Sequence, residues 1–110
     1  MRKIFLLAFL ISCQEAPQKH RDFSGMWDTP FGYMHLVQER DRVRGTYRSE
    51  LGSLEGRIRR DTLYFTWEDP DGEGDGFFVL SEDGRSISGA YRRKGEPEWE
   101  GGWWGVRLSR

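Results

Sequence analysis

The 110-residue sequence has one cysteine and two histidines, and these three side chains are far apart in the chain. One cysteine excludes an intramolecular disulfide bond. The separation of Cys13, His20 and His35 gives no metal-ligand spacing of the zinc type. The sequence also has no nucleophile-elbow or phosphate-loop motif. A lone strand histidine such as His35 is more often structural than a general base. We therefore expect a protein that is not an enzyme and has no cofactor.

An excess of one charge is also missing. The chain has 17 basic and 18 acidic residues, a net charge of −1. Residues 1–12 contain Arg2 and Lys3, so residues 13–110 have 15 basic and 18 acidic residues, a net charge of −3. Nucleic-acid surfaces need clustered basic residues, whereas the two signs are well mixed in this sequence. We expect no nucleic-acid partner.

Long apolar runs are absent as well. The longest comprises eight residues, 4–11, and follows Arg2 and Lys3. As a helix it would span only about 12 Å, against about 30 Å for the hydrocarbon core of a bilayer. A short apolar run after a positive N-terminus is typical of a secretory signal peptide.

The end of this run, Leu10-Ile11-Ser12-Cys13, resembles the lipobox of bacterial lipoproteins. That resemblance implies that residues 1–12 are removed and that Cys13 carries lipid, including acyl chains such as palmitate. The residue after Cys13 is Gln14, whereas lipoproteins that are retained in the inner membrane have aspartate at this position. The resemblance therefore favours the outer membrane of a diderm bacterium. Residues 13–22 are polar, contain a proline and read as a flexible tether. The alternatives are an ordinary signal peptide or a buried apolar strand.

From residue 23 onward, no helical stripe of apolar residues is present, and short β-rich segments alternate with turn signals. Connections this short make neighbouring strands antiparallel and sequential. We expect residues 23–110 to form one all-β domain, an eight-stranded antiparallel up-and-down (meander) β-barrel, whose closure removes exposed strand edges. The predicted strands are 23–29, 33–39, 42–48, 53–59, 62–68, 76–81, 86–92 and 102–109.

Five of these strands place a glycine two residues before a large side chain. Strand residues two apart lie on the same face, and we interpret this face as the barrel interior. Repeated small residues beside large ones provide curvature and room inside a small barrel. The five pairs are Gly25 and Trp27, Gly45 and Tyr47, Gly56 and Ile58, Gly89 and Tyr91, and Gly102 and Trp104.

The first of these pairs, in Gly25-Met26-Trp27, resembles the calycin pattern when it is taken with Arg107 near the end of the chain. In lipocalins and avidins, a G-x-W on the first strand is packed by an arginine from the last strand. The resemblance implies that Gly25, Trp27 and Arg107 close one end of the barrel. The alternative is that Gly25-Met26-Trp27 only continues the repeated glycine pattern.

The resemblance to avidin extends to residues 43–47 and to Phe65-Thr66-Trp67. It implies that Tyr47 and Trp67 face a ligand, and we add the interior aromatics Trp27 and Tyr91 to the candidate ligand-binding residues. Thr29 and Tyr33 stand where avidin has asparagine and serine, so we do not expect biotin.

We expect a membrane-tethered binding module for a small apolar ligand or an envelope protein, although eight strands leave an interior barely wide enough for side chains. One alternative is an inhibitor of an envelope protease or lysozyme, because small barrels of this type also occur among exported inhibitors. The other alternative is a structural envelope lipoprotein. The inhibitor would act through loops 69–76 and 95–101.

The segment from residue 69 to residue 76 alternates carboxylates with glycine or proline. Several oxygen ligands around glycine are typical of calcium loops, so Asp69, Asp71, Glu73 and Asp75 are candidate calcium ligands. The position that needs a bidentate glutamate is Leu80. The favoured interpretation is therefore a flexible, solvated hairpin loop with no metal.

Aromatic residues are concentrated late in the chain. Trp103 and Trp104 are adjacent, so they face opposite sides of a strand. Trp99 lies in a segment rich in glycine, proline and glutamate, and we expect it to be the more exposed residue.

Overall fold

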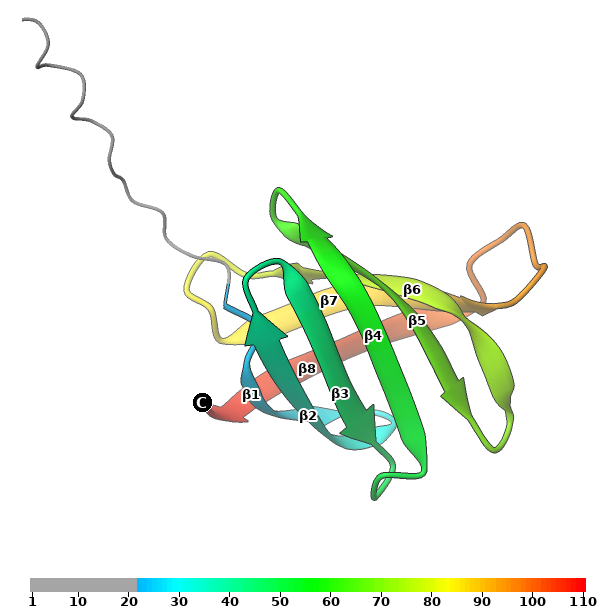
Figure 1. The fold of residues 1–110 in the computed structure, drawn as a ribbon, viewed down its shortest axis with the longest axis horizontal. Helices are drawn as coiled ribbons and strands as arrows, with labels where there is room; N and C mark the ends of the chain where they lie inside the picture. The colour runs from blue at the N-terminus through cyan, green and yellow to red at the C-terminus, as the bar shows by residue number, and fades with distance from the viewer. Residues whose placement is uncertain (1–21) are drawn as a thin grey trace, which may run out of the picture.

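The computed structural model describes residues 22–110, which form eight strands and no helix (Figure 1). The lipobox, Cys13 and residues 13–21 of the tether lie outside the described residues. The strands are β1 (Gly25–Thr29), β2 (Gly32–Glu39), β3 (Arg42–Tyr47), β4 (Gly52–Arg59), β5 (Thr62–Asp69), β6 (Gly72–Leu80), β7 (Ser86–Arg93) and β8 (Gly101–Ser109). Within residues 22–110 there is no helix long and apolar enough to cross a membrane.

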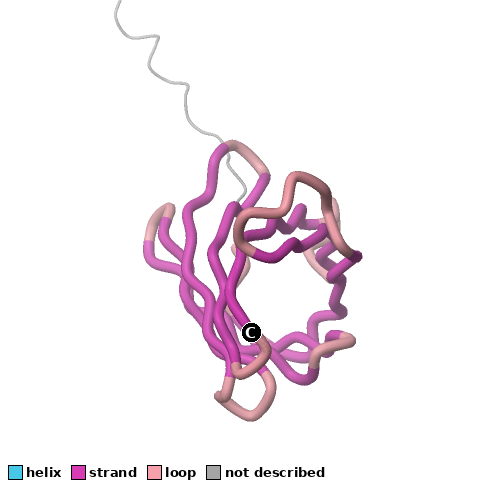
Figure 2. The backbone as a smooth tube through the Cα atoms, turned by 90° about the vertical axis from the view of Figure 1, so that its right-hand side faces the viewer, coloured by secondary structure: helices cyan, strands magenta, loops and turns pink. Residues whose placement is uncertain are grey.

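Each strand pairs antiparallel with the next, and β8 pairs with β1 to complete a closed barrel. The ring of strands is visible in Figure 2. This confirms the predicted eight-stranded up-and-down barrel. The closing pairs place Trp27 opposite Arg107 and Asp28 opposite Val106.

Most predicted strand boundaries lie within two residues of the observed ones, and one was wrong by more. Strand β6 begins at Gly72, four residues before the predicted start at Gly76, so most of the expected loop is strand. The turn is tight because Asp69 Oδ1 accepts a 2.8 Å hydrogen bond from the backbone N–H of Asp71. Glycine at position 74 allows close pairing, because a Cβ there would lie 1.9 Å from the carbonyl oxygen of Arg92.

The barrel interior is filled by side chains rather than hollow. Trp103 lies at its centre, and its ring is within 5.5 Å, centroid to centroid, of Phe31, Tyr47, Phe65 and Phe78. These contacts are edge-to-face, an arrangement that the charge distribution of aromatic rings favours. The buried apolar core is Phe23, Trp27, Met34, Leu36, Val43, Tyr47, Leu54, Leu63, Phe65, Trp67, Phe78, Leu80, Ile87 and Trp103.

The two ends of the barrel differ. We call the mouth the end that carries turns 30–31, 48–51 and 70–71 and the longer loop 94–100. The opposite end carries turns 40–41, 60–61 and 81–85, and the chain enters it through Asp22 and Phe23. The chain therefore enters the barrel at the end farthest from the mouth.

Candidate functional site

The end at which the chain enters is closed by Trp27 and Arg107. The guanidinium carbon of Arg107 lies 4.4 Å from the ring centroid of Trp27. Arg107 also donates hydrogen bonds to the carbonyl oxygens of Asp22, Ser24 and Gly84. Burial lowers the pKa of the Arg107 guanidinium. The structure thus shows the contact that the calycin resemblance implies.

Trp27 is completely buried at this closed end, and its indole N–H donates a 3.0 Å hydrogen bond to the carbonyl oxygen of Phe23. Of the four aromatics predicted to face a ligand, Trp27 is therefore separated from the other three. The structure brings Tyr47, Trp67 and Tyr91 together at the mouth.

These three residues line a small cavity that we call the mouth pocket, with a volume of about 90 Å³. Phe31 and Trp103 complete its aromatic lining. The Phe31 ring is 5.4 Å from that of Tyr91, and the Trp67 ring is 6.1 Å from that of Tyr91. Sequence analysis missed Phe31, because nothing in the Pro30-Phe31 turn indicates that its ring folds back over the barrel axis.

The polar part of the mouth pocket is formed by Tyr47, two arginines (Arg48 and Arg93) and two aspartates (Asp69 and Asp71). The Tyr47 hydroxyl donates a 2.8 Å hydrogen bond to Asp69 Oδ2. Burial, followed by this hydrogen bond and the charge of Asp69, raises the pKa of Tyr47, so the hydroxyl remains a donor. Arg48 Nη1 lies 3.0 Å from Asp71 Oδ2 and 3.6 Å from Asp69 Oδ2. The pocket thus has a fixed aromatic lining and a hydrogen-bonded edge.

One polar atom in this region has no partner. The indole N–H of Trp103 is buried and makes no hydrogen bond to any residue that the structure describes. Because buried polar groups in proteins are nearly always hydrogen-bonded, this atom is an exception that calls for an explanation. Trp103 lines the mouth pocket, where the rings of Phe31 and Tyr47 pack edge-to-face against it.

The carboxylates proposed as calcium ligands do not form a metal site. Asp69 and Asp71 contact Arg48, whereas Glu73 contacts Lys94 at 3.4 Å and Asp75 contacts Arg92 at 3.1 Å. In the described part of the chain, no group of three or more histidine, cysteine or acidic side chains is arranged to hold a metal ion. This arrangement does not support the calcium interpretation, because each carboxylate is paired with a basic side chain and the four do not converge on one point.

The turns of the mouth are acidic. They carry two basic and five acidic residues, a net charge of −3, and these are Arg48, Glu50, Asp71, Lys94, Glu96, Glu98 and Glu100. Turns 40–41, 60–61 and 81–85 at the closed end carry three basic and four acidic residues, a net charge of −1. The mouth is therefore the more acidic of the two ends.

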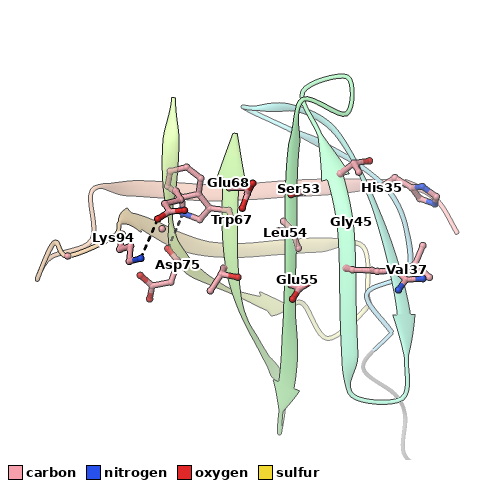
Figure 3. Close-up of a pocket in the computed structure, with 16 residues that line it drawn as sticks. His35, Val37, Gly45, Ser53, Leu54, Glu55, Trp67, Glu68, Asp75 and Lys94 are labelled. Carbon is pink, nitrogen blue, oxygen red and sulfur yellow. Dashed lines mark hydrogen bonds and ion pairs between the residues drawn. The ribbon is translucent and has the colours of Figure 1, made fainter. Parts of the chain in front are cut away.

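A second hollow, the wall groove, lies on the outer face of β2 to β6 and has a volume of about 740 Å³ (Figure 3). Outward side chains such as His35, Glu55 and Glu68 line it. At its other side, Lys94 contacts Glu73, and the Trp67 indole N–H donates a 3.3 Å hydrogen bond to the carbonyl oxygen of Asp75. Trp67 belongs to the lining of both hollows.

The exposed aromatics follow only part of the prediction. Trp103 and Trp104 face opposite sides, with exposed fractions of 2% and 55%. The interpretation that Gly102 and Trp104 face the barrel interior was therefore wrong, because Trp103 occupies the interior. Trp99 is 46% exposed, less than Trp104, because Arg92 and Phe77 pack against its ring.

Comparison of the chain with protein-family models, curated proteins and solved structures finds no match.

Proposed function

We propose that the protein is a non-catalytic binding module, tethered to the bacterial envelope through lipid on Cys13, that takes a basic side chain of a protein partner into the mouth pocket. The observation that supports this proposal is an aromatic pocket surrounded by acidic turns. The mouth lies at the end of the barrel opposite the entry of the tether, so the anchor leaves it accessible.

The size of the mouth pocket favours a side chain over a whole ligand. A volume of about 90 Å³ is three times the share of one water molecule, about 30 Å³. Pockets for drug-sized ligands have volumes of about 300–1,000 Å³. The filled barrel core offers no deeper space. A protein partner therefore fits the geometry better than the small apolar ligand that the avidin resemblance suggests.

The aromatic lining of the mouth pocket and the acidic turns around it favour a cation, whereas the two aspartates of the pocket are balanced by Arg48 and Arg93. An ammonium or guanidinium group over an aromatic face gains about 0.5–2 kcal/mol, depending on its desolvation. The net charge of −3 in the mouth turns attracts basic segments and disfavours acidic ones. Because Asp69 is held by Tyr47 and Arg48, its position does not depend on the ligand.

The wall groove extends this surface. Residues that flank the inserted side chain would pass Trp67 and lie along β4 to β6, where Glu68, Glu73 and Asp75 add further acidic groups. A stable interface buries about 1,200–2,000 Å² in total, which the mouth pocket alone does not provide. The mouth pocket thus selects the side chain, and the wall groove supplies area.

The proposal is tested by titrating the protein with N-acetyl-lysine methylamide while the indole N–H signals of the tryptophans are recorded by NMR. We expect saturable shifts for Trp67 and Trp103. The uncharged norleucine analogue should bind at least several-fold more weakly. Tyr91→Ala should abolish the shifts, whereas Tyr64→Ala, a change on the exposed face of β5, should leave them intact. Equal binding of the two analogues, or binding that survives Tyr91→Ala, contradicts the proposal.

A second candidate function, inhibition of an envelope hydrolase, is favoured by the loop between β7 and β8. This loop extends beyond the strands in Figure 1. Arg92 holds it through a 3.1 Å hydrogen bond to the carbonyl oxygen of Pro97 and a 4.5 Å contact with the Trp99 ring. A held, projecting loop is a suitable element for entry into an enzyme cleft. Assays against lysozyme and envelope proteases test this candidate, with the Trp99→Ala variant expected to lose any inhibition.

A further inference from the structure

The outer face of β8 carries an exposed apolar stripe. Trp104, Val106 and Leu108 alternate along the strand, and their exposed fractions are 55%, 56% and 54%. Their neighbours Trp103 and Gly105 are buried in the barrel. Because alternate strand residues point to the same face, all three side chains lie on one strip of the outer surface.

The strip continues sideways over β1 and β2. Val106 pairs with Asp28, and Asp28 pairs with Tyr33, which is 64% exposed. Half-buried Met26 lies two residues before Asp28 on the same side of β1. On the other side of β8, the paired residues of β7 are Ser86 and Ser88. We call the surface formed by Met26, Tyr33, Trp104, Val106 and Leu108 the apolar wall.

The opposite side of the barrel has a different character. Going around the barrel, β4 and β5 lie opposite β8 and β1. The outward residues of β3 to β6 include Arg42, Arg44, Glu55, Arg57, Glu68, Glu73 and Asp75. The outer surface is therefore apolar on one side and charged on the other, and the wall groove lies on the charged side.

The entry of the chain identifies what covers the apolar wall. Asp22 directly precedes the first core residue, Phe23, and it contacts Arg110 at the end of β8, two residues after Leu108. Cys13 and Asp22 are nine residues apart in the chain, which spans at most about 30 Å when fully extended. Lipid on Cys13 would thus be held within reach of the end of the apolar wall that carries Met26 and Leu108.

We infer that the apolar wall lies against the phospholipid surface in which Cys13 is anchored, so that the barrel rests on its side. This inference rests on the lipid anchor of the proposed function. Tyr and Trp side chains favour the boundary between membrane and water, because their rings are apolar and each carries one polar group. Asp28 lies between Val106 and Tyr33 in the sheet. Because its carboxylate would have to remain hydrated, the apolar wall can enter the membrane only to the depth of the headgroups.

The same orientation suits the rest of the molecule. The wall groove faces away from the membrane because it lies on the opposite side of the barrel. The mouth pocket opens along the membrane surface, within reach of other envelope proteins.

The inference is tested with the acylated full chain, reconstituted in vesicles of phosphatidylethanolamine and phosphatidylglycerol that contain phosphatidylcholine with a nitroxide on its headgroup. The nitroxide quenches tryptophans at headgroup depth, and of the five tryptophans Trp104 is the most exposed. We expect Trp104→Phe to remove more than half of the quenched emission. Trp99→Phe, a matched change in the loop between β7 and β8, should leave it unchanged.

A second pair of variants keeps Trp104 as the reporter. Val106→Asn combined with Leu108→Asn makes the apolar wall polar, and quenching should fall at least twofold. Tyr64→Asn on β5 is a control with similar exposure on the charged side, and it should have no effect. All these side chains are solvent-exposed, so an unchanged thermal midpoint is expected and shows that the barrel remains folded.

Three results would overturn the inference. Quenching that is insensitive to Trp104→Phe places another part of the barrel on the lipid. Loss of quenching together with self-association that Val106→Asn abolishes shows that a second copy of the chain covers the wall. An unmodified Cys13, detected by mass spectrometry, removes the anchor and this inference with it. Lysine binding at the mouth is measured without vesicles, so its failure is separate from these results.

Discussion

The hydroxyl of Tyr47 donates a 2.8 Å hydrogen bond to Asp69, which joins the end of β3 to the end of β5 across the barrel mouth. Both groups are largely buried, with the Asp69 side chain 9% exposed and Tyr47 2% exposed. The bond therefore connects two strands that are not neighbours in the sheet and fixes the edge of the mouth pocket.

Removal of this hydroxyl should destabilise the barrel. Tyr47→Phe leaves Asp69 without its buried donor, and a hydrogen bond to a charged group is worth about 1.5–3 kcal/mol. We expect a loss of about 2 kcal/mol in the free energy of unfolding, measured by urea denaturation. Tyr64→Phe, which removes an exposed hydroxyl, should change it by less than about 0.5 kcal/mol. Equal effects of the two changes would show that the bond contributes nothing.

The same pair predicts the response to alkaline pH. The pKa of Tyr47 is raised in the folded state, so the folded chain keeps a proton that the unfolded chain loses near the ordinary tyrosine pKa of about 10. Stability contributed by Tyr47 is present below about pH 10 and is lost as pH rises above it. Unfolding curves between pH 8 and 11 should show wild type declining more steeply than Tyr47→Phe. Parallel declines would contradict this assignment.

Arg107 should be the most sensitive arginine of the closed end. Arg107→Ala removes the contact with Trp27 and three hydrogen bonds to carbonyl oxygens. We expect a loss of about 3 kcal/mol, typical of a broken buried network. Arg110→Ala is the control, because its side chain is 63% exposed and makes one ion pair. Calorimetry of both variants tests this difference, and a similar thermal midpoint for the two would contradict it.

Two glycines of the same sheet should respond differently to alanine. A Cβ at position 89 would lie 1.7 Å from the carbonyl oxygen of Phe77, so Gly89→Ala must push β6 and β7 apart. At position 102 the nearest atom is 3.5 Å away, an ordinary contact. We expect Gly89→Ala to cost about 2–3 kcal/mol and Gly102→Ala less than about 1 kcal/mol. The free energy of unfolding is measured for each variant. A larger loss for Gly89→Ala supports the steric explanation, whereas equal losses would indicate a general cost of replacing glycine.

The lipid anchor makes a prediction of its own. Cys13→Ala should move the protein from the membrane fraction to the soluble fraction of the envelope, as measured by fractionation and immunoblotting. Gln14→Ala, next to the proposed modification site, should leave the protein in the membrane. Retention of the Cys13→Ala variant in the membrane fraction would exclude lipidation as its anchor.

The sequence alone was enough to predict eight strands, their order and the closed barrel. Alternating apolar residues and tight turns are local signals, and short connections allow only one topology. The early start of β6 was not predictable in the same way. Gly72 and Gly74 have little intrinsic preference for a strand. The close approach of Arg92 on β7 explains the glycine at position 74, and a φ of +146° explains the glycine at position 72.

The site depended on the tertiary structure. Trp27 and Trp67 look alike in the sequence, since each is an inward aromatic on a strand. Yet Trp27 is covered by Arg107 at the closed end, and Trp67 lines the mouth pocket. Phe31 joins the pocket from a turn, and Trp103 fills the axis that the avidin resemblance left open. The period-two pattern of a strand determines whether a side chain points into the barrel or outward. The pairing register around the closed barrel decides which other side chains it contacts inside the barrel.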